Sequence, residues 1–141
     1  MPTLAFAALA SILSAAPLNA TVTPTGMCWW HCAEAVLRER GTPRNLIDEV
    51  RATGQVEASI PSVERFLSID VIPTFQGAVP LVHRGTHVIA TLQVDGGRHA
   101  FVIVDVNERA VTLWNPNEPT RYTAATVADV SRRWVVGAVI R

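Results

Sequence analysis

The sequence predicts an α+β fold, in which helices come first and a mainly antiparallel sheet follows. Apolar residues recur at helical spacing from residue 28 to about residue 68, and the pattern changes to short β-branched runs after residue 70. Asp95-Gly96-Gly97 is a hairpin turn signal between two of these runs. The 141 residues are 49% hydrophobic and 17% charged, which is typical of one domain with its own core.

Three helices are expected in the first half of the chain. The first covers residues 28–40, and Gly41 follows where a helix typically stops. The second covers residues 42–54, because Thr42 is a typical N-cap and the proline after it is favoured in the first turn. The third is short and covers residues 61–68. Together they place the helical layer before the sheet.

Five strands are expected in the second half, over residues 71–75, 87–94, 100–106, 111–114 and 135–140. The third of these is rich in β-branched residues, as a central strand requires. The turn at residues 107–110 should join it to the fourth strand as a hairpin. A helical pattern over residues 123–134 separates the fourth strand from the fifth.

Composition excludes several classes of function. Twelve basic and twelve acidic residues cancel, so the chain has neither an electrostatic footprint for nucleic acid nor a polybasic membrane patch. Two cysteines, four positions apart, do not make a disulfide framework. We therefore expect both cysteines to be free thiols.

The first twenty residues form a segment of their own, so that the predicted domain covers residues 21–141. Residues 4–18 are almost wholly apolar, and Leu18-Asn19-Ala20 resembles the cleavage site of a secretory signal. However, no Lys or Arg precedes the apolar stretch, and a buried helix or an interdomain linker is the alternative. The stretch is too short and too interrupted for a membrane span.

Three residue types suited to thiol chemistry occur at defined places in this pattern. Cys28 opens the first helix, where unpaired N–H groups and the helix dipole favour a thiolate. His99 begins one strand and Asn115 ends the next. A hairpin turn near residue 108 sets residue 99 almost opposite residue 117, which brings His99 and Asn115 to one edge. Cysteine, histidine and asparagine together indicate a thiol hydrolase.

The same residues carry a family resemblance. Met-Cys-Trp at 27–29 opens an Ala-rich helix, Gly-Arg-His-Ala-Phe-Val-Ile-Val occupies 97–104, and Trp-Asn-Pro occupies 114–116. In these motifs the chain resembles papain-like cysteine peptidases, above all the small bacterial C39-like and C70 (effector-type) peptidases and papain-fold toxin domains. The resemblance covers most of the chain from about Leu18 onward. It implies a nucleophile helix packed on an antiparallel sheet, a protein or peptide substrate, no cofactor, and secretion or delivery outside the producing cell.

One feature of the family is absent. Papain-like enzymes usually carry a glutamine several residues before the nucleophile, and its side chain helps to hold the oxyanion. That position falls near Val22, and the region contains no glutamine. Asn19 is the nearest amide side chain and is the candidate replacement, beside the backbone N–H of Cys28. Loss of one oxyanion donor typically lowers the rate by about two to three orders of magnitude.

The sequence therefore predicts a small cysteine peptidase with Cys28 as nucleophile, His99 as base and Asn115 as the residue that orients the base. Two alternatives stay open: a peptidoglycan amidase of the thiol class, and a catalytically inactive papain-like binding module, which the missing glutamine favours. A zinc site built from Cys28-x3-Cys32 and His83-x3-His87 is disfavoured, because the two pairs lie fifty residues apart. Neither substrate specificity nor oligomeric state follows from the sequence.

Overall fold

The computed structural model describes residues 15–18, 27–54 and 57–141. Its helices are α1 (Cys28–Glu39), α2 (Leu46–Ala52), α3 (Ile60–Glu64), α4 (Phe75–His83) and α5 (Val127–Arg133). Its strands are β1 (Ile69–Ile72), β2 (Val88–Val94), β3 (Gly97–Val106), β4 (Ala110–Trp114), β5 (Tyr122–Thr126) and β6 (Trp134–Ile140).

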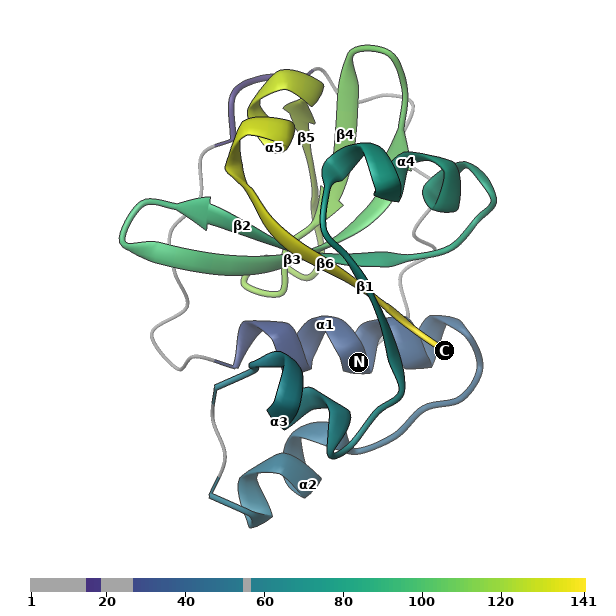
Figure 1. Ribbon diagram of the computed structural model, residues 1–141, viewed down its shortest axis with the longest axis vertical. Helices are drawn as coiled ribbons and strands as arrows, with labels where there is room; N and C mark the ends of the chain where they lie inside the picture. The colour runs from purple at the N-terminus through teal and green to yellow at the C-terminus, as the bar shows by residue number, and fades with distance from the viewer. Residues whose placement is uncertain (1–14, 19–26, 55–56) are drawn as a thin grey trace.

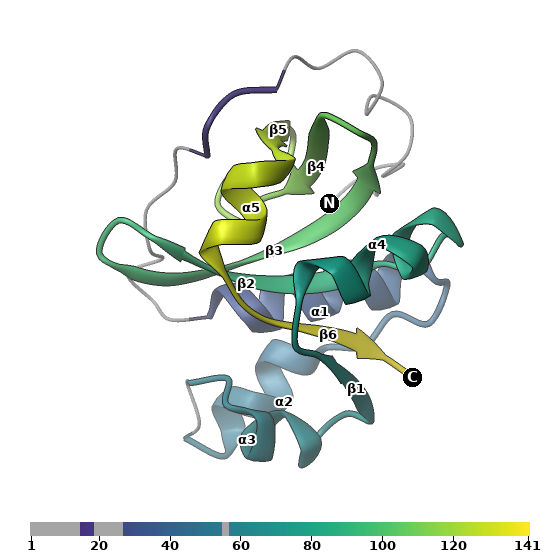
Figure 2. The same ribbon diagram turned by 45° about the horizontal axis from the view of Figure 1, so that its top comes forward.

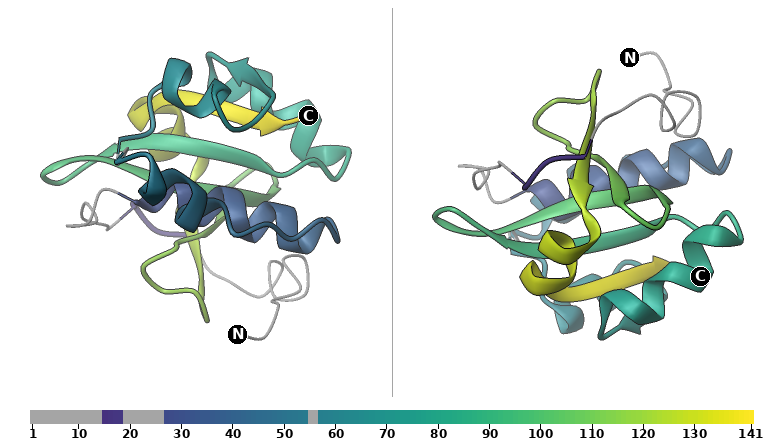
Figure 3. Two further views of the ribbon diagram at one scale, coloured as in Figure 1. Left: turned by 90° about the horizontal axis from the view of Figure 1, so that it is seen from below. Right: turned by 90° about the horizontal axis from the view of Figure 1, so that it is seen from above.

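The strands form one antiparallel sheet in the order β1-β6-β2-β3-β4-β5. Helices α1, α2 and α3 lie on one face of the sheet, and α4 and α5 lie on the other (Figures 1 and 2). The view from below in Figure 3 shows α1 running alongside the central strands on the first face. This arrangement confirms the expected α+β fold with an N-terminal helix packed on a mainly antiparallel sheet.

Two apolar cores fill the space on either side of the sheet, and β3 contributes to both. Ala100 and Val102 belong to the core under α1, whereas Phe101 and Ile103 belong to the core under α4 and α5. This alternation is the ordinary period of a strand, in which successive side chains point to opposite faces. Because both faces are covered, β3 is the central strand that its β-branched sequence predicted.

The first helix begins at Cys28 as expected, but the second begins later than expected. Gly41 adopts a left-handed conformation with φ of 78°, and Thr42 donates its backbone N–H to the carbonyl of Leu37 at 2.9 Å. Thr42 therefore closes the C-terminus of α1 instead of capping the next helix. Asn45 precedes α2 in its place, and the prediction that the second helix starts at Thr42 is wrong.

Two predictions in the second half need correction. The strand expected over 71–75 is β1, which ends at Ile72, and α4 follows with Thr74 as its N-cap. The helix expected over 123–134 begins as β5, and only α5 is helical. In both places a threonine side chain accepts a backbone N–H of the first turn, and this cap sets the helix start.

Residues 15–18 lie against the domain. Ala16 bridges Ala125 in parallel, with hydrogen bonds of 3.1 Å to the backbone of both Ala124 and Thr126. Leu18 is buried, and its backbone N–H donates to Oδ2 of Asp129 at 2.8 Å. These contacts extend the β5 edge of the sheet. Within the described ranges, no helix is long and apolar enough to cross a membrane.

Candidate active site

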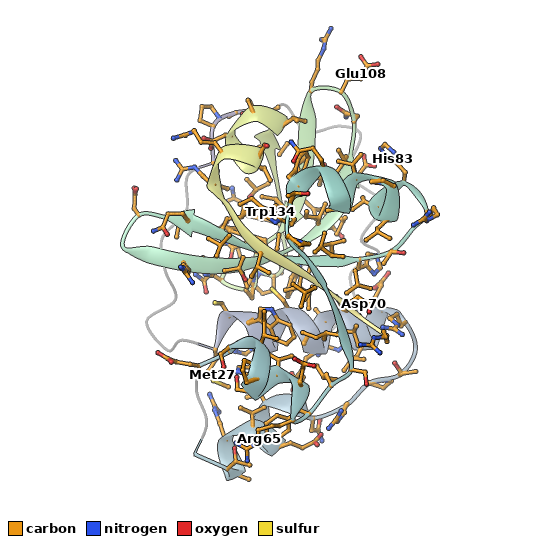
Figure 4. All side chains as sticks on the ribbon, in the orientation of Figure 1. Met27, Arg65, Asp70, His83, Glu108 and Trp134 are labelled. Carbon is orange, nitrogen blue, oxygen red and sulfur yellow. The ribbon has the colours of Figure 1, made fainter. Side chains whose placement is uncertain are left out.

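The thiol of Cys28 lies at the start of α1, and the residue before it provides no side-chain cap. Met27 is buried and occupies the N-cap position without a hydrogen bond from its side chain, and the first turn contains no acidic residue. The positive end of the helix dipole is therefore not neutralised by a local carboxylate. Figure 4 shows Met27 at the end of α1 that lies on the side of the β2–β3 hairpin.

The two cysteines differ in their surroundings. Cys28 is partly exposed, whereas Cys32, one turn further along α1, is fully buried. Burial raises the pKa of the Cys32 thiol well above its ordinary value, and the neighbouring Cys28 adds to this effect. Cys32 is thus an apolar core residue, and Cys28 is the cysteine that is accessible to solvent.

His99 is the third residue of β3, and its side chain is fully buried. Its ring packs edge-on against Phe101, with ring centroids 4.7 Å apart. Nε2 of His99 lies 2.8 Å from Oδ1 of Asn115. Burial lowers the pKa of His99 below its usual value, and the hydrogen bond to Asn115 offsets only part of this shift. Its surroundings therefore favour the neutral imidazole.

Asn115 fixes the tautomer of this imidazole. Its Oδ1 also accepts the backbone N–H of Asn117 at 2.9 Å. Because a backbone N–H can only donate, this end of the Asn115 amide is its oxygen, and the His99 Nε2 must carry the proton that it shares with that oxygen. Nδ1 then has the lone pair that a general base requires.

The hairpin of β3 and β4 brings His99 and Asn115 together. Val102 pairs with Trp114 and Ile103 pairs with Leu113, so the same register continued beyond the strands sets residue 99 opposite residue 117. The sequence predicted this pairing approximately, and it did not predict the β-bulge between Ile103 and Asp105, where the register shifts. The indole N–H of Trp114 donates to the carbonyl of Pro119 at 3.1 Å and holds the loop that carries Asn115.

Cys28 and His99 line the same groove, which has a volume of about 560 Å³. Its sheet side includes a row of paired residues on three neighbouring strands, Ala100, Thr91 and Val136. Facing this row are Trp29 and residues 57–60, which lead into α3. The groove therefore runs between the sheet and the helical layer, with the thiol on its wall.

Several predicted or considered residues lie elsewhere. Asn19, the candidate oxyanion donor, lies outside the described residues. Cys28 and Cys32 are on α1 and His83 is on α4, across the sheet. In the part of the chain that the structure describes, no three His, Cys, Asp or Glu side chains gather as metal ligands.

Sequence reasoning missed two charged residues of the groove, Glu57 and Arg98. Arg98 stands within the motif that contains His99, and alternation along β3 places it on the same face as Ala100, which packs under α1. Glu57 comes from the irregular segment before α3, for which the sequence offers no pattern.

Comparisons with known proteins bear on the fold. No family model and no curated protein matches the sequence. Among solved structures, the chain is similar to the peptidase domain of Streptococcus ComA, a bi-functional ABC transporter involved in a quorum sensing pathway. The TM-score is 0.65 at 8% sequence identity, and the match covers 88% of this chain and 96% of the other. The similarity supports the papain-like fold expected from the sequence.

Proposed function

We propose that this protein is a small cysteine peptidase that cleaves peptide bonds with Cys28, His99 and Asn115. The observation that carries the proposal is the 2.8 Å contact between Nε2 of His99 and Oδ1 of Asn115, beside the groove that the thiol of Cys28 also lines. Because this hydrogen bond places the proton on Nε2, the lone pair of the imidazole is on Nδ1. The fold similarity to a peptidase domain supports the same function.

The reaction that we propose begins when Nδ1 of His99 takes the proton of the Cys28 thiol. The thiolate attacks the carbonyl carbon of the scissile bond, and the oxygen becomes an oxyanion beside the N–H groups at the start of α1. Oδ1 of Asn115 stabilises the imidazolium through the Nε2 proton. His99 then protonates the leaving amine, and the acyl group stays on Cys28 as a thioester. In the next step His99 takes a proton from water, which hydrolyses the thioester and frees Cys28.

The identity of the second oxyanion donor stays a prediction, and Asn19 is its candidate. A binding module without activity is the competing interpretation, because the expected glutamine is absent before Cys28. The peptidoglycan amidase, the effector or toxin role and delivery outside the producing cell also remain predictions from the sequence.

The proposal is tested by the pH dependence of iodoacetamide labelling of Cys28, measured by peptide mass spectrometry. Cys32 in the same molecule is the internal control, because its thiol is buried. We expect fast labelling of Cys28 below pH 7 and slower labelling in His99→Ala. Labelling that rises only near the unperturbed thiol pKa of about 8.5 and is unchanged in the variant would favour the binding module.

A further inference from the structure

The groove contains a cation that the proposed reaction does not use. Arg98 precedes His99 on β3 and shares the face of Ala100, which packs in the core under α1. Its side chain is exposed and lines the groove together with Cys28. Among the residues that the structure describes, no carboxylate or carbonyl pairs with the Arg98 guanidinium.

The other charged residue that lines this groove is Glu57, which lies in the facing wall before α3. Glu57 and Arg98 do not form an ion pair with each other. The sheet side of the groove thus carries the positive charge of Arg98. A negatively charged group in the groove is attracted to this β3 wall.

We propose that Arg98 is a specificity-determining residue that binds a carboxylate of the substrate close to the scissile bond. This inference rests on the proposed peptidase function, and it adds the chemical class of the substrate. The guanidinium presents planar, paired donors that match the two oxygens of a carboxylate. The carboxylate belongs either to an Asp or Glu side chain or to the C-terminus of the peptide, and both present the same two oxygens.

A pair of alkylating agents tests this inference without a known substrate. Iodoacetate and iodoacetamide deliver groups of nearly the same size to a thiol, but only iodoacetate carries a carboxylate. We expect Arg98→Gln to lower the ratio of the iodoacetate rate to the iodoacetamide rate at Cys28 by about fivefold, the order expected for a nearby exposed charge pair at low salt. The rate ratio of Arg98→Lys should lie between those of wild type and Arg98→Gln, because the charge is kept. Added salt should lower the rate ratio of the wild type.

Arg109→Gln is the matched control. It removes the same charge from an exposed arginine in the turn after β3, about 25 Å along the strand from Arg98. We expect this variant to keep the wild-type ratio. An equal ratio in wild type and Arg98→Gln would overturn the inference, as would an equal slowing of both reagents in Arg98→Gln.

Cleavage of synthetic peptides then identifies the source of the carboxylate. One library carries Glu or Gln at each position with amidated C-termini, and the other has free or amidated C-termini without acidic side chains. In one of the two libraries, we expect the wild-type enzyme to cleave the neutral peptide with a kcat/KM about tenfold lower than that of the acidic peptide. The Arg98→Gln variant should cleave both peptides equally. Equal rates for acid and neutral peptides in both libraries would reject the carboxylate site.

The two proposals fail in different ways. If the peptidase proposal is wrong, iodoacetamide labelling of Cys28 shows no dependence on His99. If only the role of Arg98 is wrong, that dependence persists and the reagent ratio is unchanged in Arg98→Gln.

Discussion

Nε2 of His99 lies 2.8 Å from Oδ1 of Asn115, and that oxygen also accepts the N–H of Asn117. The amide therefore acts toward the imidazole as an acceptor. It holds one tautomer without adding a negative charge, in contrast to an aspartate at the same place.

Replacing this neutral acceptor by a charged one should change the titration of the base. We expect Asn115→Asp to raise the pKa of His99, because a carboxylate stabilises the imidazolium while the N–H of Asn117 keeps its acceptor. The imidazole resonances in an NMR titration measure this directly. Asn115→Ala is the comparison, and an unchanged His99 titration in Asn115→Asp would contradict the hydrogen bond.

The lowered pKa of His99 also predicts a dependence of stability on pH. Burial lowers this pKa below 6.5, so between the folded and unfolded values the unfolded state binds more protons. The free energy of unfolding should therefore fall as the pH drops below 6.5. The pKa values of His31 and His87 are also lowered, so these residues contribute to the same decline. His99→Gln should therefore make the decline shallower without abolishing it.

Denaturant unfolding at pH 7, 6 and 5 measures this decline. His83→Gln is the control variant, because His83 is exposed and lies on α4, outside the groove. A pH slope in His99→Gln identical to that of wild type would show that His99 binds protons equally in both states.

Asp129 ties residues 15–18 to the domain, and its loss should be costly. The carboxylate is buried and accepts from the N–H of Leu18 and from the guanidinium groups of Arg132 and Arg133. We expect Asp129→Ala to lower the free energy of unfolding by about 2 kcal/mol, because a buried acceptor with several donors is removed. Denaturant titration measures the change.

Asp70→Ala is the matched control for this substitution. Asp70 pairs with Arg141 at 2.9 Å, but both side chains are more than half exposed, so the expected loss is less than about 1 kcal/mol. Burial raises the pKa of Asp129, but its three hydrogen-bond donors lower it more. The pKa of Asp129 in the folded protein is therefore below its usual value of 3.8. The Asp129 contribution is therefore present above pH 3.8 and is lost as the pH falls through the folded value. Equal losses in the two variants would contradict this assignment.

Gly137 of β6 is expected to tolerate no side chain. A Cβ at this position would lie 2.6 Å from Cζ2 of Trp134 and 3.2 Å from Cβ of Ile72. Gly137→Ala should lower the free energy of unfolding by about 1 to 3 kcal/mol, because the strand or the indole must shift. Gly77→Ala in α4 is the control, since its nearest contacts are 3.4 Å or longer. A melting temperature of Gly137→Ala equal to that of the control would contradict the packing.

The sequence was most informative where local chemistry decides the structure. A turn at residues 95–97, a second turn near residue 108 and the β-branched run between them sufficed to predict the β3–β4 hairpin and that His99 and Asn115 lie close together. The start of α1 at Cys28 was predicted in the same way, from helical spacing.

Prediction failed where competing local signals or tertiary contacts decide. Thr42 is a residue type that is typical of an N-cap, but its backbone N–H donates to the carbonyl of Leu37 and ends the preceding helix. Gly77 and Pro80 inside α4 hid its helical pattern, and Thr74 as its cap went unrecognised. The groove itself depends on residues from α1, the segment before α3 and three strands, and no local pattern predicts that assembly.

The position of β6 has a consequence for the synthesis of the protein. This strand follows every other described element along the chain, yet it pairs between β1 and β2, and its Val136 lines the groove beside Thr91. A nascent chain on the ribosome therefore lacks the groove until the residues of β6 have emerged. Such long-range pairing also slows folding, because the ends of a long loop must meet before the contacts form. The groove is therefore complete only when β6 has paired with β2.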